Sequence, residues 1–328
     1  MERKYAEFAA TKACELLAID SPSGYTQKAA TWVKEAFEAL GFAAKITTKG
    51  GVLADLGGAD KDDALFLQAH TDTLGAMVAE VKANGRLKLT PLGGLRAENA
   101  ETENVRVHTR TGKIIEGTVQ LCNASVHVNG EYGEAKRTFD TVEAVLDEDV
   151  KTAEDTRALG IEVGDIVCLE PRTRITSSGY IKSRFLDDKL SVGVLLGLAK
   201  YLHDTGKTPA RRVYAHVTVY EEVGHGGSGS VPSGVTESIS VDMGCEETGL
   251  RAQKSRSPSA SRIPAGPTAT RSWASSLMRP RKRAPTTRST CTRTTARTWR
   301  RRSARALISG TVSSAPASTR ATAMNGAI

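Results

Sequence analysis

Apolar residues recur with helical spacing in three parts of the chain. The spacing predicts helices over the ranges 5–19, 26–40 and 190–202. The first ends at a Ser-Pro-Ser-Gly turn over residues 21–24, and the second ends at Gly41, the residue type that most often closes helices. The third follows Asp187 and Asp188, whose carboxylates are well placed to cap its first turn.

Short β-rich runs lie before and after the third helix. They predict strands at 43–47, 52–56, 64–68, 212–220 and 238–244. Helices and strands that alternate in this order are typical of an α/β domain. The expected fold class is therefore α/β, a sheet with helices on both faces.

Residues 75–178 interrupt this pattern with short β-like runs separated by Gly, Asn and charged turns. The runs lie at 77–82, 113–119, 124–128 and 166–170. Their spacing predicts a small β-barrel or sandwich inserted into the α/β body. The expected domains are a discontinuous α/β domain, the insert and a tail, with the boundaries 1–74 and 179–250, 75–178, and 251–328.

Charge is distributed unevenly along the 328 residues. The net charge is +8, but residues 251–328 hold 17 of the 45 Lys and Arg residues and no Asp or Glu. Residues 1–250 therefore carry 28 basic against 37 acidic side chains. Leu, Ile, Val and Phe together number six of the 78 tail residues, a composition that predicts a disordered basic segment.

Cysteine usage and hydropathy narrow the cellular setting. The five cysteines are scattered without Cys-x-x-Cys spacing, which indicates neither a disulfide framework nor a thiolate zinc site. No run approaches the roughly 18 apolar residues that a membrane span needs, and no apolar signal core follows Met1. A cytoplasmic protein without a membrane partner is expected.

Hard ligands stand where the predicted strands end. Glu221 and Glu222 close a β-rich run before a Gly-rich turn, and at a strand end both can reach one crevice, as a metal ligand and a general base. The other candidates are His70, Asp72, Asp187 and Asp242. Imidazole and carboxylates without thiolates suit zinc, cobalt or manganese in a hydrolytic site. Taken singly, these residues also fit a solvated strand end, a capped turn or a helix N-cap.

The order of these residues resembles a known family. The resemblance rests on His70-x-Asp72, Asp187-Asp188-Lys189, Glu221-Glu222 and Asp242, together with the turn at 21–24 and the insert after His70. In this order they are similar to the tetrahedral or glutamyl aminopeptidases, metallopeptidase family 42. The resemblance covers residues 1 to about 248. It implies a zinc-peptidase-like catalytic domain over 1–74 and 179–250, with the β-barrel insert mediating oligomerisation.

The resemblance also implies roles for the residues. Asp187 would bridge two divalent metal ions, zinc or cobalt with manganese as an alternative, and would precede a cis peptide bond to Asp188. His70 and Glu222 would each hold one metal, and Asp242 would complete a site. Glu221 would be the general base, with Asp72 beside it in the catalytic set. The implied activity is the hydrolysis of N-terminal residues from short peptides through a metal-bridging hydroxide, in self-associated particles such as tetrahedral dodecamers.

One ligand of the family is missing from this sequence. The family carries a histidine near its C-terminus, whereas the last histidine here is His225. If the codons of the tail are read one base earlier, residues 263–268 permit Asp-Ser-Gly-Gly-Pro-Tyr and residues 322–328 permit His-Gly-Tyr-Glu-Arg-Ser-His, both similar to family sequence. We therefore expect that the reading frame slips between about Cys245 and Lys254, and that loss of the histidine impairs this chain as an enzyme.

Other functions remain open at this point. A related di-metal exopeptidase or deacylase shares the ligand order but usually lacks the insert. A nucleic-acid-binding protein would use the tail as a basic arm, although the tail lacks Lys-rich clusters. A non-catalytic scaffold built from the insert is the third alternative.

The frame slip is directly testable. Sequencing the gene through codons 240–330 should find a one-base slip between codons 245 and 254, and correcting it should restore a C-terminal histidine. An uninterrupted frame through that window would contradict the hypothesis.

Overall fold

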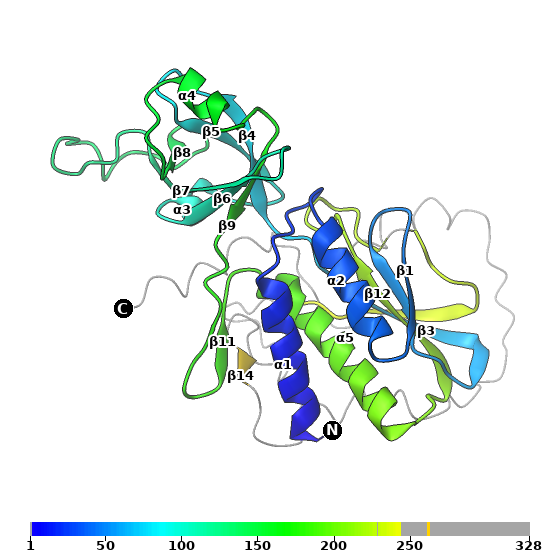
Figure 1. The fold of residues 1–328 in the computed structure, drawn as a ribbon. Helices are drawn as coiled ribbons and strands as arrows, with labels where there is room; N and C mark the ends of the chain where they lie inside the picture. The colour runs from blue at the N-terminus through cyan, green and yellow to red at the C-terminus, as the bar shows by residue number, and fades with distance from the viewer. Residues whose placement is uncertain (1, 228, 244–260, 263–328) are drawn as a thin grey trace, which may run out of the picture.

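The computed structural model describes residues 2–227, 229–243 and 261–262. The basic tail and the expected frame slip lie outside the described residues, apart from the two-residue strand β14 (Ser261–Arg262). Within the described part, an α/β body carries a separate β-barrel (Figure 1). The expected α/β class with a small inserted barrel is confirmed.

A five-stranded mixed sheet forms the body, in the order β1-β2-β12-β3-β13. Its strands are β1 (Ala43–Ile46), β2 (Val52–Asp55), β3 (Asp60–His70), β12 (Arg211–Thr218) and β13 (Val235–Ser240). β3 pairs in parallel with β12 on one side and with β13 on the other, while β1, β2 and β12 pair antiparallel. The three parallel strands therefore end at the same edge.

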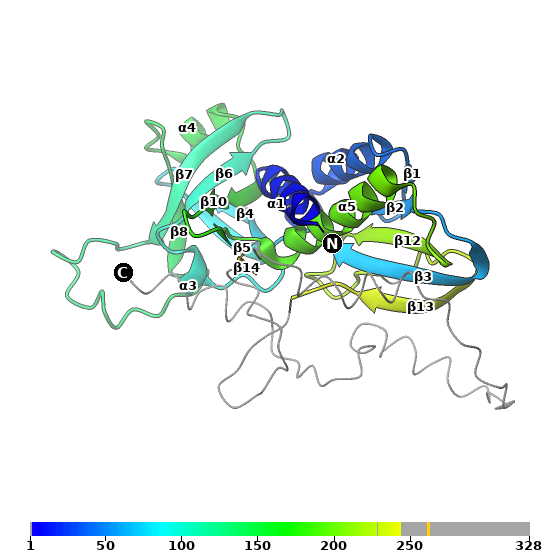
Figure 2. The same cartoon turned by 90° about the horizontal axis from the view of Figure 1, so that it is seen from below.

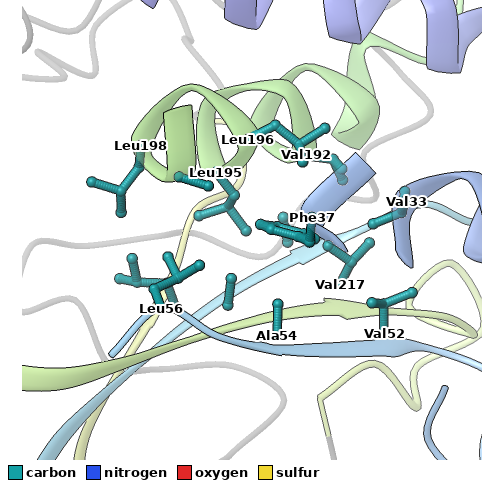
Figure 3. Close-up of a cluster of buried hydrophobic side chains, with 14 of the residues drawn as sticks. Val33, Phe37, Val52, Ala54, Leu56, Val192, Leu195, Leu196, Leu198 and Val217 are labelled. Atoms are coloured by element: carbon teal, nitrogen blue, oxygen red, sulfur yellow. The ribbon is translucent and has the colours of Figure 1, made fainter. Parts of the chain in front are cut away.

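Three helices cover the sheet, and in the described residues they lie on one face of it (Figure 2). They are α1 (Arg3–Leu17), α2 (Gln27–Glu38) and α5 (Leu186–Thr205). The helices expected on the other face are not among the described residues. The shared core follows the two-residue period of the strands, since Val52, Ala54 and Leu56 all contribute to it. Phe37 of α2 and Leu195 of α5 pack above them (Figure 3).

A contact between α1 and α5 depends on two glycines. A Cβ atom added to Gly193 would lie 2.5 Å from the backbone oxygen of Ala9 and 2.8 Å from the Ala13 Cβ. One added to Gly197 would lie 2.9 Å from the Ala9 Cβ. The small residues on both helices therefore let the two backbones approach closely.

The insert is a closed six-stranded barrel in the order β4-β5-β8-β7-β6-β9. Its strands are β4 (Gly75–Val81), β5 (Leu87–Leu92), β6 (Asn104–His108), β7 (Ile114–Leu121), β8 (Val142–Leu146) and β9 (Ile166–Leu169). The short helices α3 (Ala97–Ala100) and α4 (Ala153–Ala158) accompany it. A small sheet of β10 (Arg174–Ile175), β11 (Tyr180–Lys182) and β14 leads back to the body.

The prediction of a strand at residues 124–128 of the insert is wrong. Residues 124–128 lie in turns of the long β7–β8 connection, and Val126 and Val128 are exposed. Alternating valines resemble a strand, but no strand in the described part of the chain pairs with them. The connection is held instead by Arg137, which binds the Glu101 carboxylate and the backbone oxygens of Tyr132 and Ala135.

Asp20, just before the Ser-Pro-Ser-Gly turn, ties the body to the barrel. Arg106 and His108 of β6 contact its carboxylate at 2.6 Å and 2.8 Å. Burial alone would raise the pKa of Asp20, but the hydrogen bonds with His108 and Arg106 lower it to about 2. The link therefore persists across the physiological pH range. No helix in the described residues is long and apolar enough to cross a membrane.

The glycine contact predicts a loss of stability on Gly193→Ala. Helix propensity alone favours Ala by about 1 kcal/mol, whereas overpacking a tight contact costs about 1–3 kcal/mol. Because the new methyl meets backbone, we expect the clash to dominate and the free energy of unfolding to fall by about 1–2 kcal/mol. Gly197→Ala meets a side-chain methyl at 2.9 Å and a backbone oxygen only at 3.2 Å, so it should lose less stability. Urea denaturation of both variants tests this, and a stabilised Gly193→Ala variant would contradict it.

Candidate metal centre

The predicted ligands gather at the edge where the parallel strands end. His70 is the last residue of β3, Glu221 and Glu222 follow β12, and Asp242 follows β13. Asp187 lies at the start of α5, which packs against β3. The carboxyl ends of parallel strands form the crevice in which open α/β sheets bind ligands. The topology therefore brings residues from distant parts of the chain to one place.

The His70 imidazole is buried at the centre of this group. Its Nε2 atom lies 3.0 Å from Asp187 Oδ1 and 3.7 Å from Glu221 Oε2. Its Nδ1 atom lies 3.0 Å from the backbone oxygen of Asp72. Burial alone would lower the pKa of His70, but its contacts with Asp187 and Asp72 raise it well above the usual value. The surrounding carboxylates therefore stabilise positive charge at this point.

Asp72 contacts both the imidazole and the glutamate pair. Its Oδ1 atom lies 3.5 Å from His70 Nδ1 and accepts the Glu221 N–H at 3.1 Å. Its Oδ2 atom accepts the Glu222 N–H at 3.3 Å and the Ser23 hydroxyl at 2.6 Å. Burial alone would raise the pKa of Asp72, but the hydrogen bond with His70 lowers it. This carboxylate therefore stays ionised, and its position supports the expected role of holding the imidazole.

Asp187 and Asp188 enter the site through an irregular start of α5. The peptide bond between them is cis, as the resemblance implies, and both have non-helical backbone angles. Asp188 is buried, and its Oδ2 atom accepts the backbone N–H of His70 at 3.2 Å. Among the described residues, no group donates a hydrogen bond to its Oδ1 atom. A buried carboxylate oxygen without a donor is costly and offers a free ligand atom.

At this edge of the sheet, two sets of side chains among the described residues lie close enough to hold a metal ion. His70, Asp187 and Glu222 form one set, and His70, Asp188 and Asp242 form the other, with the ligand atoms of each within 4.8 Å of one another. The other five residues predicted from the sequence thus lie around His70. The structure adds Asp188, which the sequence analysis placed at a helix cap and in the family motif without a ligand role, and Ser23, which it noted only as part of a turn. Adjacency to Asp187 was the one sequence signal for Asp188.

The chemistry of the set fits divalent metal ions. The donors are one imidazole and several carboxylates, with no thiolate, as borderline and hard cations prefer. Burial and the neighbouring Asp187 raise the pKa of Glu222 to about 8, and burial raises the pKa of Asp188 well above its usual value. These acids repel one another's charge, so an entering cation would stabilise all of them together.

His216, expected to be a core histidine, has no part in either set. It is buried and stacks on Phe66, with ring centroids 5.0 Å apart. Burial lowers its pKa to about 4, so the ring is neutral at physiological pH.

Comparison with known sequences gives a consistent match. A family model described as M42 glutamyl aminopeptidase matches residues 50–281. A putative aminopeptidase of Bacillus subtilis, YhfE, is 40% identical over 230 residues, which cover 70% of this chain and 66% of that protein. The glutamyl aminopeptidase of Lactococcus lactis is 25% identical over 64% of this chain and 58% of its own length. The chain thus spans less than two thirds of the length of these relatives.

Solved structures share the fold. The Pyrococcus horikoshii TET1 peptidase has a TM-score of 0.62 at 20% identity, over 73% of this chain and 70% of its own. A TET aminopeptidase from a marine sediment archaeon has a TM-score of 0.59 at 23% identity, over 66% of this chain and 60% of its own. At these identities the likeness concerns the fold.

The raised pKa of Glu222 predicts a pH-dependent metal affinity. Below pH 8 this carboxyl holds a proton that metal binding must displace, and His70 adds a second proton in the same direction. The affinity for Zn²⁺ should therefore fall as pH falls from 8 to 6, by about tenfold per pH unit for each proton released. Titration calorimetry in buffers of different ionisation enthalpy measures both the affinity for Zn²⁺ and the number of protons released on binding. An affinity that is constant over this range would contradict the prediction.

Proposed function

The chain belongs to the M42 glutamyl aminopeptidase family, and we propose that it is built as a metal-dependent aminopeptidase that removes N-terminal residues from short peptides. The observation that carries this proposal is the convergence of Asp187, Glu222, Asp188 and Asp242 on the single imidazole of His70. Such a set does not stabilise the fold, because carboxylates held this close together, one of them on the buried Asp188, repel one another.

The proposed ligands are His70, Asp187, Glu222 and Asp242, with Asp188 as a further candidate. Two divalent ions, zinc or cobalt with manganese as an alternative, would supply Lewis acidity for the peptide carbonyl and would lower the pKa of a water molecule. Asp187 would be the candidate for contacting both ions, because it shares one ligand set with His70 and Glu222 and also lies near Asp242 of the other set, whose pKa is raised by burial and by the charge of Asp187.

Glu221 is the proposed general base. Its side chain is 44% exposed, whereas those of His70 and Asp72 are almost fully buried, so Glu221 alone of these three can meet solvent and substrate. Burial raises the pKa of Glu221, although the proximity of His70 opposes the shift. A carboxylate with a raised pKa takes up a proton more readily at neutral pH, as a general base must. Asp72 accepts the Glu221 backbone N–H and so holds this residue in position for proton transfer.

The same geometry supports a reduced capacity for the second metal. In the described residues His70 is the one imidazole in either ligand set. Its Nδ1 atom is engaged by Asp72, which leaves Nε2 for a metal ion. We therefore propose that this chain binds one ion well and the other weakly, and that its peptidase activity is low without the expected C-terminal histidine.

We also propose an assembly and a cellular location for this chain, because it belongs to the M42 family. The Pyrococcus horikoshii TET1 peptidase can assemble into a tetrahedron or a large octahedral shell. We propose that this chain also self-associates, as a dodecamer or as dimers, with the barrel of residues 75–178 as the contacting part. A cytoplasmic location accords with its three described cysteines, which are all free thiols.

Two neighbouring substitutions separate the proposed roles. Glu221→Gln should lower kcat for short peptides by about 10²–10⁴-fold while the affinity for Zn²⁺ changes little, because a general base and not a ligand is lost. Glu222→Gln should weaken Zn²⁺ affinity itself. Affinities are measured on this chain, and kcat on the same variants with the C-terminal frame restored. A Glu221→Gln variant that keeps full activity would exclude the assignment.

A further inference from the structure

Ser23 lies in a turn that runs beside the site without facing the metal ligands directly. The segment from Ser21 to Ser23 is joined to Thr73 by two backbone hydrogen bonds, from Ser23 N to Thr73 O at 3.2 Å and from Thr73 N to Ser21 O at 2.9 Å. The Ser23 side chain is buried, and its hydroxyl donates to Asp72 Oδ2 at 2.6 Å. A hydrogen bond to an ionised carboxylate at this length belongs to the strong class.

The acceptor of this bond determines the position of two other parts of the site. Asp72 lies within 3.5 Å of the His70 ring and accepts the backbone N–H groups of both Glu221 and Glu222. The Asp72 side chain has no exposed surface, so water is not available to replace a lost donor. If the carboxylate turned, the imidazole at the end of β3 and the glutamates after β12 would lose their partners together.

We propose that Ser23 is a positioning residue of the metal centre, whose hydroxyl holds the Asp72 carboxylate in the one orientation that fixes both the His70 imidazole and the Glu221–Glu222 backbone. The inference rests on the proposed function in so far as these residues bind metal. Ser23 belongs to neither ligand set and acts through Asp72. Residues that orient metal ligands in this indirect way typically change metal affinity by about 10–100-fold when removed.

The chain supplies its own control in Ser21. This serine lies two residues away in the same turn, is also buried, and donates its hydroxyl to the Thr71 backbone oxygen at 2.7 Å. Ser21→Ala therefore removes a buried serine hydrogen bond from the same segment without removing a donor from Asp72. Any general loosening of the turn should appear in both variants, whereas a specific effect on the carboxylate should appear only at Ser23.

The experiment compares four variants of the full chain: Ser23→Ala, Ser23→Thr, Ser23→Val and Ser21→Ala. Thr and Val have nearly the same shape and differ in the hydroxyl, so this pair tests the hydrogen bond even if Ser23→Ala fails to fold. The first measurement is hydrogen exchange of the Glu221 and Glu222 amides in protein treated with chelator. The second is calorimetric titration of the same samples with Zn²⁺ alone.

We expect exchange at these two amides to be at least tenfold faster in Ser23→Val than in Ser23→Thr, with Zn²⁺ affinity about 10–100-fold weaker. Ser21→Ala should change affinity by less than about threefold, because the carboxylate keeps its donor. Equal exchange in the Thr and Val variants, or equal losses of affinity at Ser21 and Ser23, would overturn the proposal. If exchange responds as expected but the unsubstituted chain binds no Zn²⁺, the positioning role stands and the proposed function fails.

Discussion

The parallel pairing of β3 with β12 on one side and β13 on the other is the constraint on which the site depends. In the register of β12, Thr218 pairs with His70, so the chain after β12 leaves the sheet beside the imidazole. β13 ends on the other side of β3, and Asp242 follows it by two residues. Without this pairing, nothing would bring residue 70 close to residues 222 and 242, because more than 150 residues of sequence separate it from both.

The α/β body around this edge remains folded although several carboxylates lie close together there. Acids with raised pKa values, such as Glu222 and Asp188, destabilise the fold, and the buried His70 offsets only part of their repulsion. The apolar core of α2, α5 and the sheet includes residues of β3 and α5, the elements that carry His70 and Asp187, and its burial offsets this destabilisation. Functional sites commonly carry such unfavourable terms, which ligand binding then relieves.

Sequence reasoning succeeded where a local pattern decides the outcome. The helical periodicity and the hydrophobic runs locate α1, α2, α5 and most strands of the sheet, and the hard ligands at strand ends identify the residues that meet at His70. It failed where the outcome depends on a distant partner. β5 and β6 carry charged residues such as Lys88 and Arg106, and they become strands because they pair with neighbours in the closed barrel. Residues 124–128 look like a strand, but no strand in the described residues pairs with them. Likewise, nothing local to Ser23 or Asp188 shows that each contacts the end of β3.

The geometry of one histidine finally limits what the site can do. His70 belongs to both ligand sets, yet an imidazole with Nδ1 directed at Asp72 presents a single nitrogen, Nε2, to the centre. The set with Asp188 and Asp242 and the set with Asp187 and Glu222 therefore compete for one nitrogen donor. An ion that took Nε2 would leave the other set with its two carboxylates alone, and carboxylates without an imidazole favour harder cations over zinc. A second imidazole would remove this competition.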